Sequence, residues 1–169
     1  TAGWGEARAD RSCTQKSLMI AGKTYERGVG THADSALTVD LKGAGLAFSA
    51  LVGVDGGAGE RGSIVFRISG DGKELWSSGL MKGGQPAKEA RVDLRGVKLL
   101  LLEADSGEDG IDYDHADWAE AKFEMESGAK PASVVPPPPP REHKGRGFFL
   151  GIYDAVRDYL KECFTHRFY

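Results

Sequence analysis

The sequence has no long apolar run, only two cysteines and none of the short motifs that mark common catalytic sites. No apolar stretch exceeds four residues, as at Leu99 to Leu102, so we expect no membrane span. Cys13 and Cys163 form neither a disulfide framework nor a zinc-ligand spacing, which leaves the redox compartment open. A G-x-S-x-G elbow, a Walker loop and an H-E-x-x-H motif are all missing. These absences argue against several classes of enzyme.

The start of the chain lacks a basic and then apolar leader, since it opens directly at Thr1. Either a signal peptide has been removed or the chain is a fragment, and we favour the fragment. Net charge is uneven, at −6 over residues 1–126 and +3 over residues 127–169. Because phosphate binding needs a basic face, the acidic first part argues against a nucleic-acid partner.

The region between residues 37 and 125 alternates apolar and polar residues over several short segments. Such period-two alternation, broken by glycine-rich turns such as Gly70-Asp71-Gly72, is typical of antiparallel β-structure. No helical periodicity intervenes. We therefore predict an all-β domain, an antiparallel β-sandwich over residues 1–126, with strands near residues 37–41, 46–54, 64–68, 74–76, 90–94, 97–103 and 118–125.

The remaining residues differ in composition. Residues 127–147 are rich in proline and include five consecutive prolines, Pro136 to Pro140, which predict a semi-rigid polyproline II spacer. Residues 148–169 show an apolar stripe at helical spacing, which predicts a short amphipathic helix. Such a helix is marginal alone in water, so we expect it to dock on the sandwich, on a protein partner or within a further domain. An artificial extension added for expression is the other alternative.

An acidic segment lies between Glu103 and Glu120 and contains no lysine or arginine. Carboxylates gathered in a flexible loop can bind calcium, although the spacing is not that of an EF-hand. The simpler interpretation is a solvated acidic loop. If calcium binds, Asp112 and Asp114 are the candidate ligands, because they precede the last predicted strand.

Trp118 and two histidines are candidates for a binding role. Trp118 is in phase with the polar residues of its strand, so its ring is either covered by a loop or open to a ligand. His32 and His115 lie in loop-like segments beside small and acidic residues, where an imidazole can bond a hydroxyl group or tie two loops together.

Several longer motifs resemble a known family. The order Trp4-Gly5, Ile20 to Ala33, Phe48 to Asp55, Gly62 to Phe66, Gly70 to Lys73 and Asp114 to Ala119 is similar to that of the NPCBM domain. This "novel putative carbohydrate-binding module" is also called carbohydrate-binding module family 51. The resemblance covers residues 1–126 and leaves out the linker and the tail.

The resemblance implies a galactose-binding-like jelly roll, usually attached to a glycoside hydrolase and secreted or on the cell surface. It implies non-catalytic binding of galactose-containing glycans at loops on one end of the sandwich. We place the sugar there, with Tyr25 and Trp118 offering ring faces and His32 a hydrogen bond. The family's binding loops vary, and here they correspond to residues 10–17, 55–62 and 79–87.

Two other functions remain open. The domain could serve as a protein-interaction module that docks a partner through its C-terminal helix. It could also be a stand-alone glycosidase, but paired carboxylates are too plentiful in this sequence to indicate one.

Overall fold

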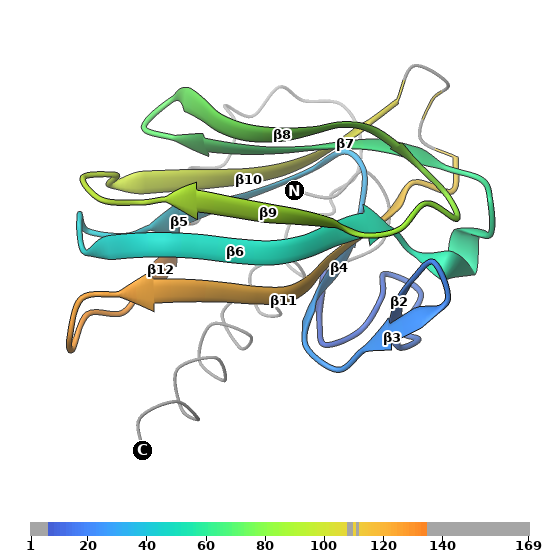
Figure 1. The fold of residues 1–169 in the computed structure, drawn as a ribbon, viewed down its shortest axis with the longest axis horizontal. Helices are drawn as coiled ribbons and strands as arrows, with labels where there is room; N and C mark the ends of the chain where they lie inside the picture. Colours follow the sequence, from blue (N-terminus) through green and yellow to red (C-terminus); the bar gives the residue numbers. More distant parts are fainter. Residues whose placement is uncertain (1–6, 108–109, 111, 135–169) are drawn as a thin grey trace, which may run out of the picture.

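A computed structural model describes residues 7–107, 110 and 112–134, and within these ranges it is built from strands and one 3-10 turn (Figure 1). The predicted linker from residue 135 onward and the predicted tail helix lie outside the described residues. No helix in the described part is long and apolar enough to cross a membrane. The elements are β1 (Arg8–Ala9), β2 (Leu18–Ile20), β3 (Lys23–Tyr25), β4 (Gly28–His32), β5 (Ser35–Asp40), β6 (Gly45–Val54), η1 (Gly56–Ala58), β7 (Ser63–Gly70), β8 (Lys73–Lys82), β9 (Lys88–Asp93), β10 (Leu99–Ser106), β11 (His115–Met125) and β12 (Ala132–Val134).

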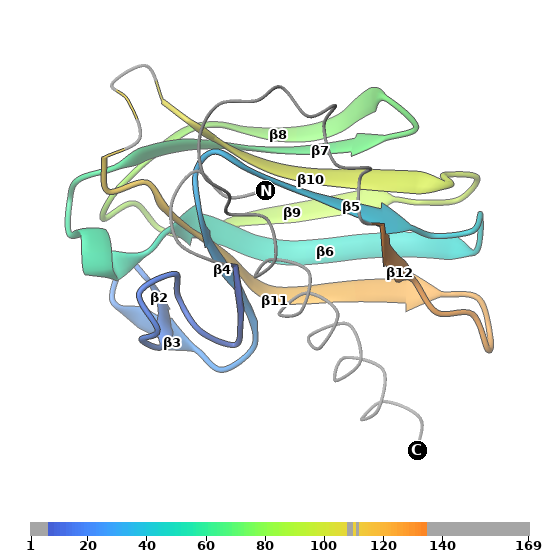
Figure 2. The same ribbon diagram turned by 180° about the vertical axis from the view of Figure 1, so that it is seen from behind.

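Two five-stranded antiparallel sheets face each other and form a sandwich, seen from its two sides in Figures 1 and 2. The first sheet has the order β1-β4-β11-β6-β9, and the second has the order β12-β5-β10-β7-β8. A small β2-β3 hairpin lies against the first sheet. The predicted antiparallel β-sandwich is therefore confirmed, and every strand expected from residue 37 onward is present.

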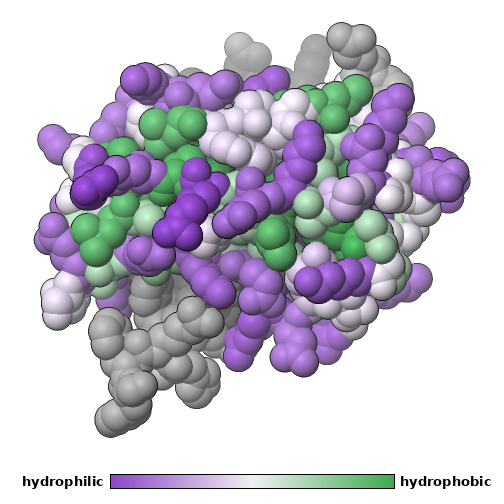
Figure 3. Space-filling model, in the orientation of Figure 1, coloured by the Kyte–Doolittle hydropathy of each residue, from purple (hydrophilic) through white to green (hydrophobic). Residues whose placement is uncertain are grey.

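The main core fills the space between the sheets with the inward residues of alternating strands. Phe48, Phe66, Ile64, Ile68 and Leu100 are among its fully buried side chains. Apolar burial on this scale supplies the main driving force for folding. The outward residues are mostly polar, and Figure 3 shows hydrophilic residues over much of one face with hydrophobic ones in separate small areas.

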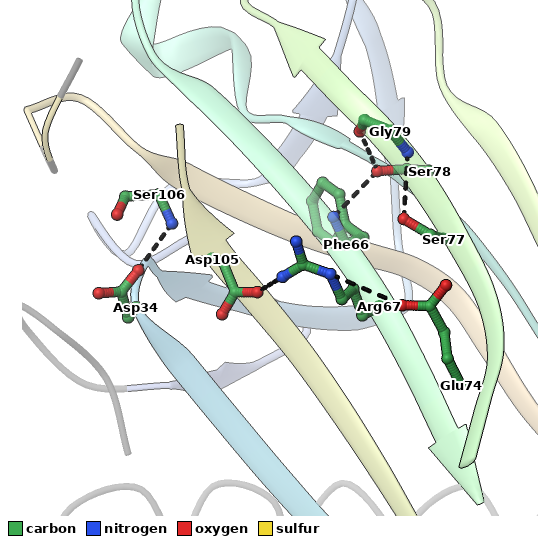
Figure 4. A network of polar contacts seen from close by, with 9 residues as sticks. All are labelled: Asp34, Phe66, Arg67, Glu74, Ser77, Ser78, Gly79, Asp105 and Ser106. Carbon is green, nitrogen blue, oxygen red and sulfur yellow. Dashed lines mark hydrogen bonds and ion pairs between the residues drawn. The ribbon is translucent and has the colours of Figure 1, made fainter. Parts of the chain in front are cut away.

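The second sheet carries a polar network on its outer surface (Figure 4). Arg67 of β7 contacts Asp105 of β10 and lies 3.8 Å from Glu74 of β8. At the same sheet, Ser78 Oγ accepts a hydrogen bond of 2.9 Å from the backbone N–H of Phe66. These contacts link β10, β7 and β8 across the sheet.

The sandwich extends further along the chain than the sequence predicts. Ala132–Val134 falls in the expected linker but pairs with β5, so the second sheet continues beyond Glu126.

The prediction that Trp118 lies on the polar side of its strand was wrong. Glu120 has a φ of 50° and the register of β11 against β6 shifts between Ala119 and Lys122, which is a β-bulge. The bulge reverses the alternation, so Trp118 faces the main core.

Candidate functional site

Four connections meet at one end of the sandwich, on the right in Figure 1, and we call this the loop end. They are residues 33–34, 55–62, 83–87 and the connection from β10 to β11, of which the structure describes residues 107, 110 and 112–114. Backbone hydrogen bonds tie them together, because Ala33 N–H donates to Asp114 O at 3.0 Å and Gly83 N–H to Gly62 O at 3.2 Å. A surface of this kind combines several loops on a rigid scaffold, as binding sites commonly do.

Two glycines let these loops pack backbone against backbone. A Cβ on Gly62 would lie 2.4 Å from Tyr113 O, and one on Gly83 would lie 2.4 Å from Arg61 O. No side chain fits at such distances, so both positions require glycine. The loop end is therefore held in one arrangement by its own backbone.

Asp114, a predicted metal ligand, is buried between two of the loops. Its Oδ1 accepts a hydrogen bond of 2.7 Å from Ser63 N–H, while Asp112 is exposed. Among the residues that the structure describes, no three His, Cys, Asp or Glu side chains gather in a way that could hold a metal. Calcium takes six to eight oxygen ligands, which two carboxylates do not provide. A calcium site at Asp112 and Asp114 stays a prediction.

Tyr113 presents an aromatic ring at the loop end that the sequence did not single out. Tyr113 is 43% exposed, and the guanidinium carbon of Arg61 lies 3.6 Å from the centroid of its ring. Stacking by a planar cation holds one face of the ring in place. The exposed part of the ring is then available to an apolar surface of a ligand, with the donors of Arg61 beside it.

His32 and His115 lie directly opposite each other on β4 and β11, with ring centroids 5.3 Å apart. His32 is buried, and its Nδ1 is 2.7 Å from Ala33 O, so this nitrogen carries the hydrogen. His115 is half-buried. Burial, and then the nearby His32, lower the pKa of His115, while Asp55 opposes the shift. A neutral imidazole offers one donor and one acceptor, which suits a hydroxyl group.

The other two predicted contacts lie elsewhere in the fold. Tyr25 belongs to β3 of the hairpin and is buried in a small cluster with Leu18, Ile20 and Ala119, and Lys23 Nζ lies 5.0 Å from its ring centroid. Trp118 packs in the main core. Of the three predicted residues, the structure brings only His32 to the loop end, where His115 and Tyr113 join it.

Most of the described part of this chain is similar to known proteins. The family model described as "NPCBM/NEW2 domain" matches residues 1–124. Alpha-1,3-galactosidase B of Akkermansia muciniphila is 41% identical over 120 residues, which cover 69% of this chain and 15% of that protein. A putative endo-alpha-N-acetylgalactosaminidase of Renibacterium salmoninarum is 31% identical over 140 residues, covering 79% of this chain and 9% of that protein. The chain thus spans a small part of the length of both relatives.

Two solved structures, each 32% identical in sequence, also resemble this chain. CBM51 of Clostridium perfringens GH95, in complex with methyl-galactose, has a TM-score of 0.68 and 32% identity and covers 73% of this chain and 91% of its own. CBM51-2 of Clostridium perfringens ZmpB, solved with GlcNAc and the INT domains, has the same TM-score and identity and covers 73% of this chain and 28% of its own. The first match extends over nearly the whole of a separate module.

Proposed function

Because the chain belongs to the NPCBM/NEW2 domain family, we propose that it binds galactose-type glycans at its loop end. It is a carbohydrate-binding module and not an enzyme domain. The observation that carries the choice of sugar is the match to the GH95 module, which was solved with methyl-galactose and aligns over 91% of its length.

The loop end supplies the groups that a sugar needs. Tyr113 offers an exposed ring for the apolar C–H face of a pyranose, and Arg61 holds that ring while keeping donors for hydroxyl oxygens. His115, with its lowered pKa, adds a neutral imidazole close to His32. We propose Tyr113, Arg61 and His115 as contacts, with His32 positioning His115.

Binding of this kind serves targeting. A single small site of a few polar groups and one ring gives weak affinity, so tethering to a larger protein makes the contact useful. Both relatives are glycosidases by name and much longer than this chain. We propose that the module holds a linked glycoside hydrolase near its glycans, outside the cell or at its surface. A protein partner for residues 148–169 falls outside the described residues and has no support in the comparisons.

Calorimetric titration of the full chain with methyl-galactoside tests the proposal, with N-acetylglucosamine titrated in parallel. We expect the galactoside to bind and Tyr113→Ala to weaken binding about tenfold or more. Leu99→Ala is the matched control, because Leu99 is 46% exposed but begins β10, at the opposite end from the loops. Absence of binding to both sugars, and to a glycan array, would overturn the proposal.

A further inference from the structure

Two buried acids lie on the outer side of the first sheet, beneath the segment of residues 10–25. Asp55 follows β6 and is 2% exposed, and Asp117 lies in β11 and is 0% exposed. Asp117 stands opposite Gly30 of β4 and Gly53 of β6 in the strand register. A carboxylate buried this completely is unfavourable unless it is paired or neutral.

The glycines on both sides of Asp117 let the covering segment lie directly on the sheet. A Cβ on Gly30 would be 2.3 Å from Arg11 O, and one on Gly53 would be 2.4 Å from Ile20 Cγ2. The backbone of residue 11 and the side chain of Ile20 therefore close the space beside Asp117. Little solvent remains to stabilise a charge there.

One backbone donor is shared between the two acids. Met19 N–H lies 3.1 Å from Asp55 Oδ2 and 3.1 Å from Asp117 Oδ2, so both oxygens converge on one nitrogen. Asp55 accepts a second bond, since Gly57 N–H donates to its Oδ1 at 2.9 Å. Asp117 Oδ1 is buried without a hydrogen-bond partner among the described residues.

We propose that Asp55 and Asp117 form a hydrogen-bonded acid pair that holds one proton in the native state, with the proton on Asp117, and that this pair fastens β2 to the first sheet. Two ionised carboxylates, each with an oxygen 3.1 Å from the same nitrogen, would repel each other in a medium that screens them poorly. Asp55, with two N–H donors, is the better site for the negative charge. A neutral Asp117 can donate its O–H to Asp55, and its remaining oxygen is then an uncharged carbonyl.

The charged and titratable groups on the surrounding elements agree with this assignment. Burial raises the pKa of Asp117 well above its usual value, as do the charge of Asp55 and the hydrogen bond to it. Burial, and then the charge of Asp55, raise the pKa of the Cys13 thiol in the covering segment to about 12, so the thiol is neutral. Arg8 of β1 is the cation acting on Cys13, and the pKa of His115 is lowered by burial and by His32. The described groups that act on the pKa of Asp117 are Asp55 and the backbone N–H of Met19, and neither of them carries a positive charge.

The pair gives the domain a definite response to pH. An ordinary aspartic acid in the unfolded chain is ionised above about pH 4, whereas the folded chain keeps the proton on Asp117. Unfolding then releases a proton, and the unfolding equilibrium constant rises by up to about tenfold per pH unit until the folded pKa is reached. The domain is thus more stable in mildly acidic surroundings, whether or not it binds a sugar.

Infrared spectroscopy of the full chain near pH 6 tests the proton directly, because ordinary carboxyl groups are ionised there. We expect the carbonyl stretch of a protonated acid in the wild type and in Asp40→Asn, and its loss in Asp117→Asn. Asp40 is the matched control, since its Oδ1 caps only the N–H of Lys42 in a turn. A wild-type spectrum without the band, or a band that Asp117→Asn retains, would overturn the proposal.

Stability gives the second measurement. We expect the ratio of the unfolding constants of wild type and Asp117→Asn to change with pH above about pH 4, by up to about tenfold per unit, until the raised pKa of Asp117 is reached. The contribution of His115 cancels in this ratio. A ratio that does not change with pH overturns the proposal. If Asp117→Asn does not fold, Asp55→Asn replaces it. This variant removes the charge that opposes ionisation of Asp117, so the infrared band should disappear at a lower pH than in the wild type, and a band with unchanged pH dependence would overturn the proposal.

Discussion

Replacing Trp118 with alanine tests whether this residue belongs to the core or to the binding site. The indole is 5% exposed and lies in the main core between the sheets. Its ring meets Phe66 edge to face, with centroids 5.2 Å apart and an angle of 86°, and Phe48 at 6.4 Å. Trp118→Ala would leave a large cavity bordered by both rings.

The expected loss of stability follows from the buried contacts. Truncation of a buried Trp or Phe to alanine lowers the free energy of unfolding by about 3 to 5 kcal/mol. The edge-to-face contact with Phe66 contributes about 1 kcal/mol of its own. We expect a loss of about 4 kcal/mol, a large share of the roughly 5 to 15 kcal/mol typical of a domain.

Urea unfolding followed by circular dichroism measures this change, with Tyr113→Ala as the exposed aromatic control. Tyr113→Ala should cost less than about 1 kcal/mol because its ring is partly in solvent. Folded Trp118→Ala should still bind methyl-galactoside. A loss below about 1.5 kcal/mol, or lost binding with an unchanged urea midpoint, would refute the assignment of Trp118 to the core.

Other substitutions probe separate features. Gly30→Ala should lower the free energy of unfolding by about 3 kcal/mol or more, because the new Cβ would lie 2.4 Å from the backbone of Ser12. Gly59→Ala is the control, because Gly59 has open space around it at a φ of 68°, and it should cost about 1 kcal/mol in the same urea assay. Arg67→Met should change stability by less than about 1 kcal/mol, since its ion pairs are on the surface. Hydrogen bonds from the backbone N–H groups of residues 99 and 98 lower the pKa of Asp71. The ionised carboxylate therefore stabilises the fold above the ordinary pKa of aspartic acid, and this stabilisation is lost as the pH falls through the lowered pKa. In Asp71→Asn the melting temperature should depend less on pH below about pH 4. Addition of EDTA should lower the melting temperature only if the predicted calcium site exists.

The strands that the sequence predicts well share one physical property. In β6 and β7 one face is buried and the other is partly exposed, so the alternation of apolar and polar residues is visible. All five residues of β4 are buried, because the covering segment packs on its outer side, and β1 has only two residues. Neither strand produces an alternating pattern, so neither could be recognised from composition.

The position of Trp118 could not be predicted because its cause is a tertiary contact. Glu120 N–H donates to Arg27 O at 2.9 Å, away from the ladder that β11 makes with β6. This bond accompanies the bulge that reverses the side-chain alternation, and nothing in the local sequence marks it. The meeting of His32 with His115, and of Arg61 with Tyr113, likewise depends on connections that lie far apart along the chain.

The bulge also explains how residues 115, 117 and 118 of one strand come to lie in three different environments. Before Glu120, the odd-numbered residues of β11 face the covering segment, which places His115 at the loop end and Asp117 in the acid pair, while Trp118 turns to the core. After it, Lys122 is exposed and Phe123 packs against the core. Substitutions in this strand should therefore have separable effects: on sugar affinity at 115, on the pH dependence of stability at 117, and on stability at every pH at 118. A variant at 118 with a stability loss that varied with pH would show that the core and the acid pair are not independent.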